Sequence, residues 1–484
     1  MTINLENPAV RLRETELGGI TGYYGDARDL HDRAVCGTLK NRERFFSQCI
    51  SCSANQVKNQ LVSIVDAALV EHGPAGCSGD IPGRNMVTRN GLRKRGFEVR
   101  NLRYINTNMS EDDVIYGGRE KLERAIREAK ARFDPKAVFV TTTCPVAIIG
   151  DDVPGICDEM EKEVGVPVVA ILCEGFRTQI WATGFDAAYH GILRKIVKPA
   201  LKKRDDLVNI INFQGRDVFS PLLKDLGLTP NYIVPYSTIE RLERIAEAAA
   251  TIQICTTLGT YLAAGLEERF GVPEVKAPLP YGIAGTDACL RELARITHRE
   301  QFVEKVIERE HEKIARPLEA IRKRLAGKRV FIGAGDAHAH SLAAVVRELG
   351  MDIAGSALWH YDRNIDNGNE HSDELAHVLK HHGNFPLSIC NKQSFELVNQ
   401  LNRVKPDIFV TRHAGTVWAS KLGIPSFTIA DEHFSLGYEG ILNFGEIVAD
   451  TLDSAWFVKK VAKHSKLPYT QWWMDQSPFS QIKE

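Results

Sequence analysis

The sequence lacks an excess of charge of either sign, a long apolar run and a dense set of cysteines. Its 61 basic and 62 acidic residues leave a net charge of −1, which offers no broad electrostatic attraction to nucleic acid or to a membrane surface. No stretch approaches the ~18 apolar residues of a membrane span, and the acidic N-terminal region does not resemble a secretory signal. We therefore expect a cytoplasmic protein with neither a nucleic-acid nor a membrane partner.

Ten cysteines in 484 residues are too sparse for a disulfide scaffold, so in a reducing compartment they would be free, buried or bound to metal. Cys52, Cys77 in the run His72–Cys77, and Cys144 each lie beside an expected helix or strand end. Thiolates placed in this way can converge on one iron–sulfur cluster. A fourth, Cys255, stands alone far downstream. The sequence therefore predicts a metallocluster protein.

Short β-branched runs alternate with amphipathic stretches, a pattern typical of parallel α/β layers. The candidate strands span residues 136–140, 166–171, 208–212, 251–254, 328–332 and 407–410. Open α/β sheets bind ligands beyond the carboxyl ends of their strands. Cys144, Cys173, Cys255 and the loop Gly333–His340 follow such strands, so they lie where chemistry is expected.

Two features divide the chain. A basic stretch from Lys198 to Arg204 precedes a new strand, and a long charged helix expected over residues 299–325 stops at Gly327. From Lys328 onward a new strand, a glycine-rich loop and a helix are expected to follow one another. We therefore expect three α/β domains with a cleft between them: residues 1–205 with the three N-terminal cysteines, 206–326 with Cys255, and 327–484 with the Gly333–His340 loop and His433.

Five ordered features carry a family resemblance over nearly the whole chain. They are the run His72–Cys77, the Cys144-Pro145 turn, the segment Cys173–Arg177, the strand-to-helix junction at Cys255 and the restart at Gly327–Val330. Together they resemble the α chain of nitrogenase component 1 and its relatives. The resemblance implies three Rossmann-like domains with parallel sheets around a central cofactor cleft. It also implies an α2β2 heterotetramer with a homologous β-type chain, and electrons from an ATP-dependent iron–sulfur reductase homodimer.

By this resemblance, Cys52, Cys77 and Cys144 ligate an eight-iron relay cluster, the P-cluster, at the interface with the β-type chain. Soft thiolate donors suit iron in low oxidation states. Simple buried cysteines are the alternative. Cys49, three residues before Cys52, leaves open a zinc or redox pair, although no second pair at zinc-site spacing accompanies it.

The resemblance makes Cys255 the thiolate at one end of a larger, carbon-centred iron–sulfur cofactor, whose metal content stays open. A helix expected to begin there would favour the thiolate. His433 is the candidate ligand for the opposite end, although the family's ligand position aligns near Ala430. A buried core cysteine and a solvated loop histidine are the respective alternatives.

Two aromatic residues bear on the substrate. Trp181 and Phe185 stand where dinitrogen-reducing members carry a glutamine and a histidine, and Ala414 stands where they carry the lysine that anchors homocitrate. The replacements argue against dinitrogen reduction and for a drier, apolar pocket, with core packing as the alternative.

Among the relatives, methylthio-alkane reductases fit such a pocket, since they cleave a C–S bond of small thioethers to methanethiol and a hydrocarbon. We expect Trp181 in the catalytic pocket and His413 as a candidate acid. A cofactor-assembly scaffold remains an alternative, because the segment Gly437–Gly440 resembles scaffold sequences, and so does an alternative nitrogenase. A tetrapyrrole-reducing relative is disfavoured by Cys255, which would have no metal to hold.

The remaining histidines give weaker signals. The Gly333–His340 loop is a poor dinucleotide motif because His338 replaces its third glycine. In the resembled family this loop supplies a basic side chain near the cofactor. The candidates for this role here are His338, His340, Arg412 and His413. For each of them, an ordinary surface or core position is the expectation. We expect solvated side chains in a polar stretch for His360, His371, His377, His381 and His382.

Overall fold

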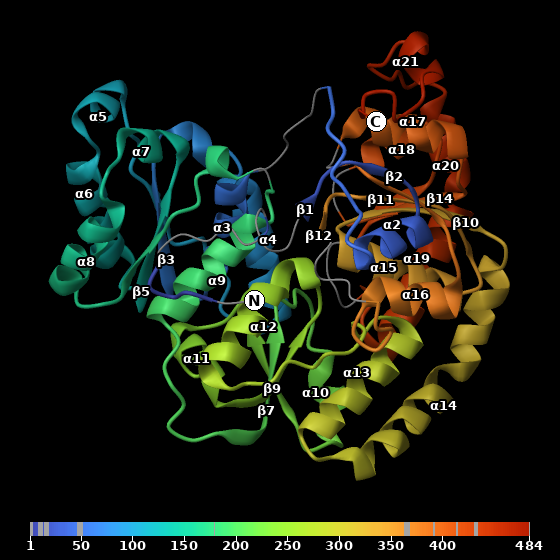
Figure 1. Cartoon of the computed structure of the whole chain (residues 1–484), viewed down its shortest axis with the longest axis horizontal. Coiled ribbons are helices and arrows are strands. Elements are labelled where there is room, and N and C mark those ends of the chain that lie inside the picture. Colours follow the sequence, from blue (N-terminus) through green and yellow to red (C-terminus); the bar gives the residue numbers. More distant parts are fainter. Residues whose placement is uncertain are drawn as a thin grey trace. The chain divides into compact units, whose positions relative to one another are not determined.

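The computed structural model describes residues 3–7, 13, 19–45, 52–178, 180–362, 368–390, 393–412, 415–429 and 434–483. The chain packs as two compact units (Figure 1). Unit 1 comprises Met1–Glu14 and Ser51–Glu274, and unit 2 comprises Thr15–Ile50 and Val275–Glu484.

The first sheet of unit 1 is wholly parallel. Its strand order is β4 (Tyr104–Asn106), β3 (Ala67–His72), β5 (Ala137–Thr142) and β6 (Val168–Ile171). Every residue of β3, β5 and β6 is buried, because helices cover both faces, so these strands are continuous apolar runs rather than alternating ones.

The two faces of this sheet pack on different helices. Helices α6 (Arg119–Phe133) and α8 (Val153–Val164) share a buried core with Val138 and Val140. On the other side, α9 (Thr183–Lys195) approaches β6 at Gly191, where an added Cβ would lie 2.0 Å from Ile171 Cδ1. Helix α3 (Ser53–Leu61) packs against α9 and β5.

A second parallel sheet completes unit 1, in the order β8 (Thr229–Ile233), β7 (Arg204–Ile211) and β9 (Ala248–Gln253). Helix α12 (Thr256–Phe270) follows β9, packs against α9, and ends at Gly271, whose φ of 62° favours glycine. The two sheets of unit 1 are thus joined through helix α9.

Unit 2 contains a six-stranded sheet. Its order is β15 (Ser426–Thr428), β14 (Ile408–Thr411), β10 (Arg329–Ala334), β11 (Asp352–Leu358), β13 (Pro386–Ile389) and β2 (Tyr23–Asp26). All neighbours are parallel except β2, which pairs antiparallel with β13. The short strand β1 (Gly19–Ile20) pairs antiparallel with β12 (Tyr361–Asp362). An N-terminal segment therefore completes a sheet built mainly from the C-terminal third of the chain.

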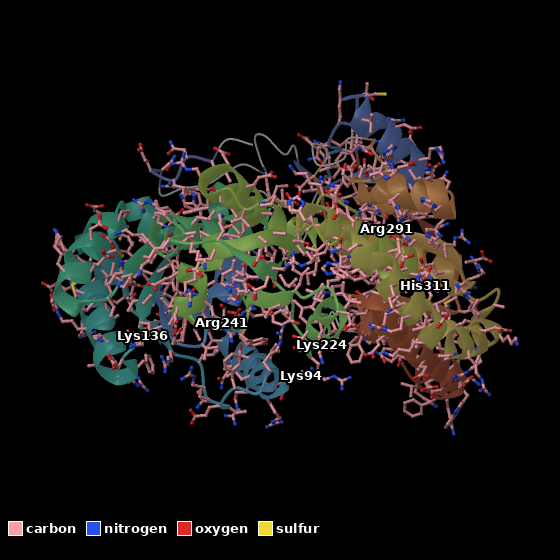
Figure 2. All side chains as sticks on the ribbon, turned by 90° about the horizontal axis from the view of Figure 1, so that it is seen from below. Lys94, Lys136, Lys224, Arg241, Arg291 and His311 are labelled. Carbon is pink, nitrogen blue, oxygen red and sulfur yellow. The ribbon has the colours of Figure 1, made fainter. Side chains whose placement is uncertain are left out.

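The helices of unit 2 pack around this sheet and against one another. Helix α14 (Glu300–Leu325) contacts α13 (Gly282–Ile296) and α19 (Gly437–Asp453). On α14, His311 Nε2 lies 2.9 Å from Asp287 Oδ1 of α13, and Arg291 of α13 pairs with Glu304 at 2.7 Å; Figure 2 labels His311 and Arg291.

The described residues form further helices along the chain. They are α2 (Ala27–Val35), η1 (Ala75–Ser78), α4 (Ile81–Lys94), α5 (Glu111–Tyr116), α7 (Cys144–Ile149), η2 (Gly175–Arg177), α10 (Phe219–Lys224), α11 (Ile239–Glu243), η3 (Ile245–Glu247), α15 (Asp336–Glu348), α16 (Glu374–His382), α17 (Ser394–Val404), α18 (Thr416–Lys421), α20 (Ala455–Ala462) and α21 (Gln471–Asp475). None of the helices in the described ranges is both long and apolar enough to cross a membrane.

The predicted α/β class with parallel sheets is confirmed, and each of the six candidate strands overlaps an observed strand. The division into domains 1–205, 206–326 and 327–484 stays a prediction. The structure groups helices α13 and α14, expected in the second domain, with unit 2, and it places residues 19–45 there as well.

One buried carboxyl ties several elements of unit 2 together and gives a prediction for pH dependence. Glu374, at the start of α16, accepts hydrogen bonds from Ser341 Oγ at 2.7 Å and from the Leu279 N–H at 2.9 Å. Burial of the carboxyl raises the pKa of Glu374 to about 7. The folded state therefore holds this proton to a higher pH than the unfolded chain, and stability falls as the pH rises towards 7.

We expect the substitution Glu374→Gln to remove this pH-dependent loss of stability. Measured by urea unfolding, the free energy of unfolding of the wild type should fall by about 2–3 kcal/mol more than that of the variant between pH 5 and pH 8. Glu312→Gln, at an exposed position of α14, is the control and should follow the wild type. Parallel curves for wild type and Glu374→Gln would contradict the assignment.

Candidate functional site

Three thiols of unit 1 lie at neighbouring ends of its first sheet. Cys52 is the N-cap of α3, Cys77 lies in η1 directly after β3, and Cys144 opens α7 after β5. Because β3 and β5 are adjacent and parallel, their carboxyl ends meet at one edge, where α/β sheets bind ligands. The structure thus places the three predicted cysteines at helix and strand ends, as expected.

Gly175, in the loop after β6, lies against two of these cysteines. An added Cβ on Gly175 would lie 2.7 Å from Cys52 Cβ, 3.3 Å from Cys52 Sγ and 4.0 Å from Cys144 Sγ. Partial burial and then the charge of Glu71 raise the pKa of the Cys77 thiol, and Cys144 and Cys52 add to this effect. All three thiols are therefore close enough to influence one another.

Side-chain hydrogen bonds fix the loop that carries Gly175. Ser53 Oγ donates to the Cys173 carbonyl oxygen at 2.9 Å, and Thr178 Oγ1 donates to Ser53 Oγ at 2.9 Å. The Cys173 N–H donates to Thr142 Oγ1 at 3.2 Å, and this hydroxyl donates to Glu174 Oε1 at 3.0 Å. The loop is thereby held to both α3 and β5. Cys173 itself is buried, and burial raises the pKa of its thiol.

A buried lysine binds the backbone of the loop that carries Cys77. Lys58 of α3 donates to the Cys77 carbonyl oxygen and pairs with Glu71 at 2.9 Å and with Asp80 at 3.2 Å. Glu71 Oε2 also accepts from Ser78 Oγ at 2.7 Å. The Lys58 side chain is only 3% exposed, whereas Cys77 is exposed. The backbone of η1 is thus anchored while its cysteine stays accessible.

The spacing of the three sulfur atoms bears on which metal they fit. Thiolates around a single tetrahedral zinc lie about 3.8 Å apart, given a Zn–S bond of about 2.3 Å. Within the described ranges, the three sulfur atoms do not form a group with all separations within 4.8 Å. Three soft donors held further apart, two of them at helix N-termini that favour thiolates, fit a multi-iron cluster better than one zinc ion.

The fourth predicted ligand, Cys255, lies elsewhere in unit 1. It is the N-cap of α12 at the end of β9 and is 2% exposed. Burial raises the pKa of Tyr189 on α9, and the charge of Cys255 contributes to this shift, so the phenol lies within electrostatic range of the thiol.

Two aromatic side chains lie at the start of α9, before Tyr189. Trp181, just before the helix, and Phe185 are both buried, and their rings meet edge to face with centroids 5.7 Å apart. Phe185 and Tyr189 are four residues apart within α9, which places them on one side of the helix, and Trp181 contacts Phe185 from just before its start. Trp181 and Phe185 are therefore buried and in contact with each other, and their place in a substrate pocket stays a prediction.

Tyr189 belongs to a small polar network that reaches α3. Asn212 Nδ2, at the end of β7, donates to Tyr189 Oη at 2.9 Å and to Gln60 Oε1 at 2.7 Å. Gln60 lies on α3, the helix that Cys52 caps. The surroundings of Cys255 and the three-cysteine group are therefore connected through one nine-residue helix.

Several predicted site residues lie outside the described residues. These are His433, His413, Cys49, Ala414 and Ala430. Their predicted roles, including His433 as a metal ligand and His413 as an acid, stay predictions.

The expectation for the histidines of the polar stretch was partly wrong. His360 and His377 are buried, with 0% and 6% exposure, because the turn between β11 and β12 and helix α16 carry them into the core of unit 2. His371 and His381 are exposed, as expected. His338 and His340 of α15 are core residues.

Sequence reasoning missed the supporting residues of the site. Lys58, Glu71, Tyr189 and Asn212 come together only through long-range packing, and no local spacing signals these contacts. Gly175 was part of a recognised segment, but its contact with Cys52 becomes visible only in the fold.

Comparison with known proteins gives a consistent picture. Residues 52–453 match the family described as nitrogenase component 1 type oxidoreductase. The chain is 30% identical over 462 residues to the nitrogenase iron-molybdenum cofactor biosynthesis protein NifE of Clostridium pasteurianum, covering 91% of this chain and 93% of the relative. It is 28% identical over 478 residues to the nitrogenase molybdenum-iron protein alpha chain of Methanosarcina barkeri, covering 87% and 88%. The solved structure of nitrogenase Cp1 at pH 6.5 matches with a TM-score of 0.70 and 22% identity, over 89% of this chain and 94% of that one.

The close contact at Gly175 gives a test of the three-cysteine site. In Gly175→Ala the new methyl group would displace Cys52, so we expect cluster affinity to fall by about 10–100-fold, as for other changes beside metal ligands. Iron per chain in anaerobically purified protein, together with visible sulfur-to-iron absorbance, measures the loss.

Gly79→Ala is the matched control, because its added Cβ meets nothing closer than 3.8 Å. Unchanged iron binding in Gly175→Ala, or equal losses in both variants, would contradict a cluster held against Gly175.

Proposed function

The chain belongs to the nitrogenase component 1 type oxidoreductases, and from this premise we propose that it is the catalytic α-type subunit of a nitrogenase-like reductase that cleaves C–S bonds of small thioethers. The observation that carries the proposal is the buried pair Trp181 and Phe185, on the side of α9 that leads to Tyr189 and Cys255. This surface is apolar where dinitrogen reduction calls for polar side chains.

The donor set fits two iron–sulfur groups. Cys52, Cys77 and Cys144 would hold an eight-iron relay cluster of the P-cluster type, and Cys255 would hold one end of a larger carbon-centred cofactor, with His433 proposed for the other end. Helix N-termini at Cys52 and Cys255 would stabilise the thiolates. When bound, the larger cofactor would supply electrons and an iron surface for the substrate.

Exposed apolar side chains around the three-cysteine site support a partner chain. Ile148 lies on α7 with Cys144 and is 72% exposed, and Phe176 follows Gly175 and is 56% exposed. Tyr116, at the end of α5, is 86% exposed. Monomeric proteins rarely leave such side chains grouped in water. We propose that a homologous β-type chain covers them in an α2β2 heterotetramer, with an ATP-dependent iron–sulfur reductase homodimer as electron donor.

The residues of the chain would act by shaping the substrate pocket and by placing protons. Cleavage of a thioether takes up two electrons and two protons and yields methanethiol and a hydrocarbon. Trp181 and Phe185 would exclude water and bind the alkyl groups. His413 is proposed as the acid that protonates the leaving thiolate. Burial raises the pKa of Tyr189, so the phenol stays protonated; its hydroxyl donates to Gln60 Oε1 at 3.4 Å, within electrostatic range of Cys255.

A cofactor-assembly scaffold is the second candidate. It is favoured by the similarity to NifE of Clostridium pasteurianum over nearly the whole length of both chains. A scaffold would pass its larger cluster to a cluster-free acceptor during incubation, whereas an enzyme would retain it and turn over.

The reductase proposal predicts ATP-dependent release of methanethiol. Anaerobic complex with its β-type partner, supplied with the partner reductase, ATP and dimethyl sulfide, should form methanethiol and methane, both measured by gas chromatography. Ammonia formation from dinitrogen without methanethiol, or transfer of the cluster to an acceptor without turnover, would contradict the proposal.

Substitution of the aromatic pair tests its role in the pocket. Trp181→Gln and Phe185→His should each lower methanethiol formation by about 10-fold or more, because they admit water and remove alkyl contacts. Phe457→His, at an exposed position of α20, is the control. Iron content is measured in parallel, and wild-type turnover in both pocket variants would contradict the assignment.

A further inference from the structure

Helix α16 of unit 2 carries two histidine rings that lie side by side. His377 and His381 are four residues apart, so they share one side of the helix on successive turns. Their ring centroids are 4.6 Å apart, and the ring planes are inclined by 42°. Two imidazoles on one tetrahedral ion bring their nitrogen atoms to about 3.3 Å, given metal–nitrogen bonds of about 2.0 Å. The pair can reach this spacing by small rotations of the side chains.

The deeper of the two rings has a nitrogen atom without a partner. His377 is 6% exposed, and its Nε2 has no hydrogen-bond partner within the described ranges. A hydrogen bond to the backbone of Glu370 holds the ring. Ligating histidines commonly bond one ring nitrogen to a backbone carbonyl in this way and leave the other nitrogen for the metal. The buried, unpaired Nε2 therefore points to a ligand beside His381.

The charges around the pair favour a cation. Burial and then the charge of His381 lower the pKa of His377 to about 4, so the ring is neutral at pH 7, the form that binds metal. The hydrogen bond from Lys380 lowers the pKa of Glu370, and the charge of His381 adds to this effect. An ionised carboxylate thus lies within electrostatic range of both rings.

Glu370 offers a third donor from the turn before the helix. Its side chain is 30% exposed, and Oε1 pairs with Lys380 Nζ. The Asp373 N–H donates to the Asn369 carbonyl oxygen at 2.8 Å, which holds this turn at the helix start. Among the described residues, the carboxylate and the two rings do not form a group with all donor separations within 4.8 Å. Metal binding therefore requires the carboxylate to turn from Lys380 towards the rings.

We propose that His377, His381 and Glu370 bind one Zn²⁺ ion, or a similar late first-row cation, with water as the fourth ligand. Two imidazoles and one carboxylate form a donor set of open zinc sites, and imidazole also suits Ni²⁺ and Cu²⁺. Ca²⁺ and Mg²⁺ prefer oxygen donors. The ion would join the turn at Glu370 to α16 within unit 2.

Zinc is the probe in the test. The complete chain, purified anaerobically in its complex, is dialysed against a chelator and titrated with Zn²⁺ by isothermal titration calorimetry. Zinc taken up by the thiols of unit 1 is common to the wild type and every variant, so their differences isolate this site. We expect one Zn²⁺ per chain that depends on the histidine pair, a rise in melting temperature on binding, and a zinc-edge anomalous peak between the two rings in soaked crystals.

The variants should move the affinity in opposite directions. His377→Gln and His381→Gln should each weaken zinc binding at this site by more than about 100-fold, and Glu370→Gln by about 10-fold, because each removes a ligand. Lys380→Gln should instead strengthen binding by about 2–5-fold, since it frees the Glu370 carboxylate from an exposed ion pair. His381 is exposed, so His381→Gln should keep the wild-type melting temperature in the absence of zinc.

Two controls separate this site from a general affinity of histidines for zinc. His382→Gln changes a ring about 100° further around the helix than His381, within range of the Arg347 charge. His464→Gln removes an exposed ring after α20. Both variants should bind zinc like the wild type.

Equal zinc uptake by the wild type and His381→Gln would overturn the proposal, since no ion would then depend on the pair. The same loss in His382→Gln as in His381→Gln would also overturn it, because the ion would then bind loosely to a histidine-rich helix end.

Discussion

The proposed cluster site depends on the close approach of three thiols at one edge of a parallel sheet. That approach needs Gly175, because any side chain there would overlap Cys52, and it needs the hydrogen bonds of Ser53, Thr142 and Thr178 that hold the loop in place. Lys58 supports the same edge from inside, since it neutralises Glu71 and binds the backbone of Cys77. The sulfur atoms are thus placed before any metal arrives, which lowers the conformational cost of holding a cluster.

Helix α3 links this edge to the second thiol. Cys52 caps its start, and Gln60 near its end shares a hydrogen-bond network with Asn212 and Tyr189, beside Cys255. A nine-residue helix is about 13 Å long, so the two thiol sites lie in one rigid framework. In the proposed reductase this arrangement would hold two metal groups at a fixed separation.

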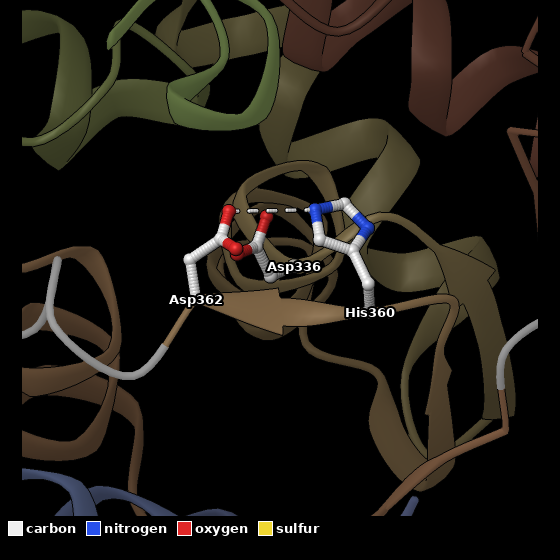
Figure 3. Close-up of side chains that lie close together, drawn as sticks. All are labelled: Asp336, His360 and Asp362. Carbon is white, nitrogen blue, oxygen red and sulfur yellow. Dashed lines mark ion pairs between the residues drawn. The ribbon is translucent and has the colours of Figure 1, made fainter. Parts of the chain in front are cut away.

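The sequence allowed much of the fold and part of the site to be predicted. Strand β5 is fully buried, β10 is buried from Val330 onward, and α14 carries a long amphipathic pattern, so local sequence signals were sufficient to predict these elements. The pairing of β2 with β13 could not be predicted, because it joins segments more than 350 residues apart. His360 was misjudged for a related reason: its neighbours are polar, but polarity nearby does not show that two strands carry the ring into the core beside Asp336 and Asp362 (Figure 3).

The most direct test of the central claim is an anomalous-scattering map, recorded at the iron edge from anaerobic crystals of the complex. We expect two separate iron peaks, one among Cys52, Cys77 and Cys144 and the other at Cys255. A map without iron at either position would contradict it.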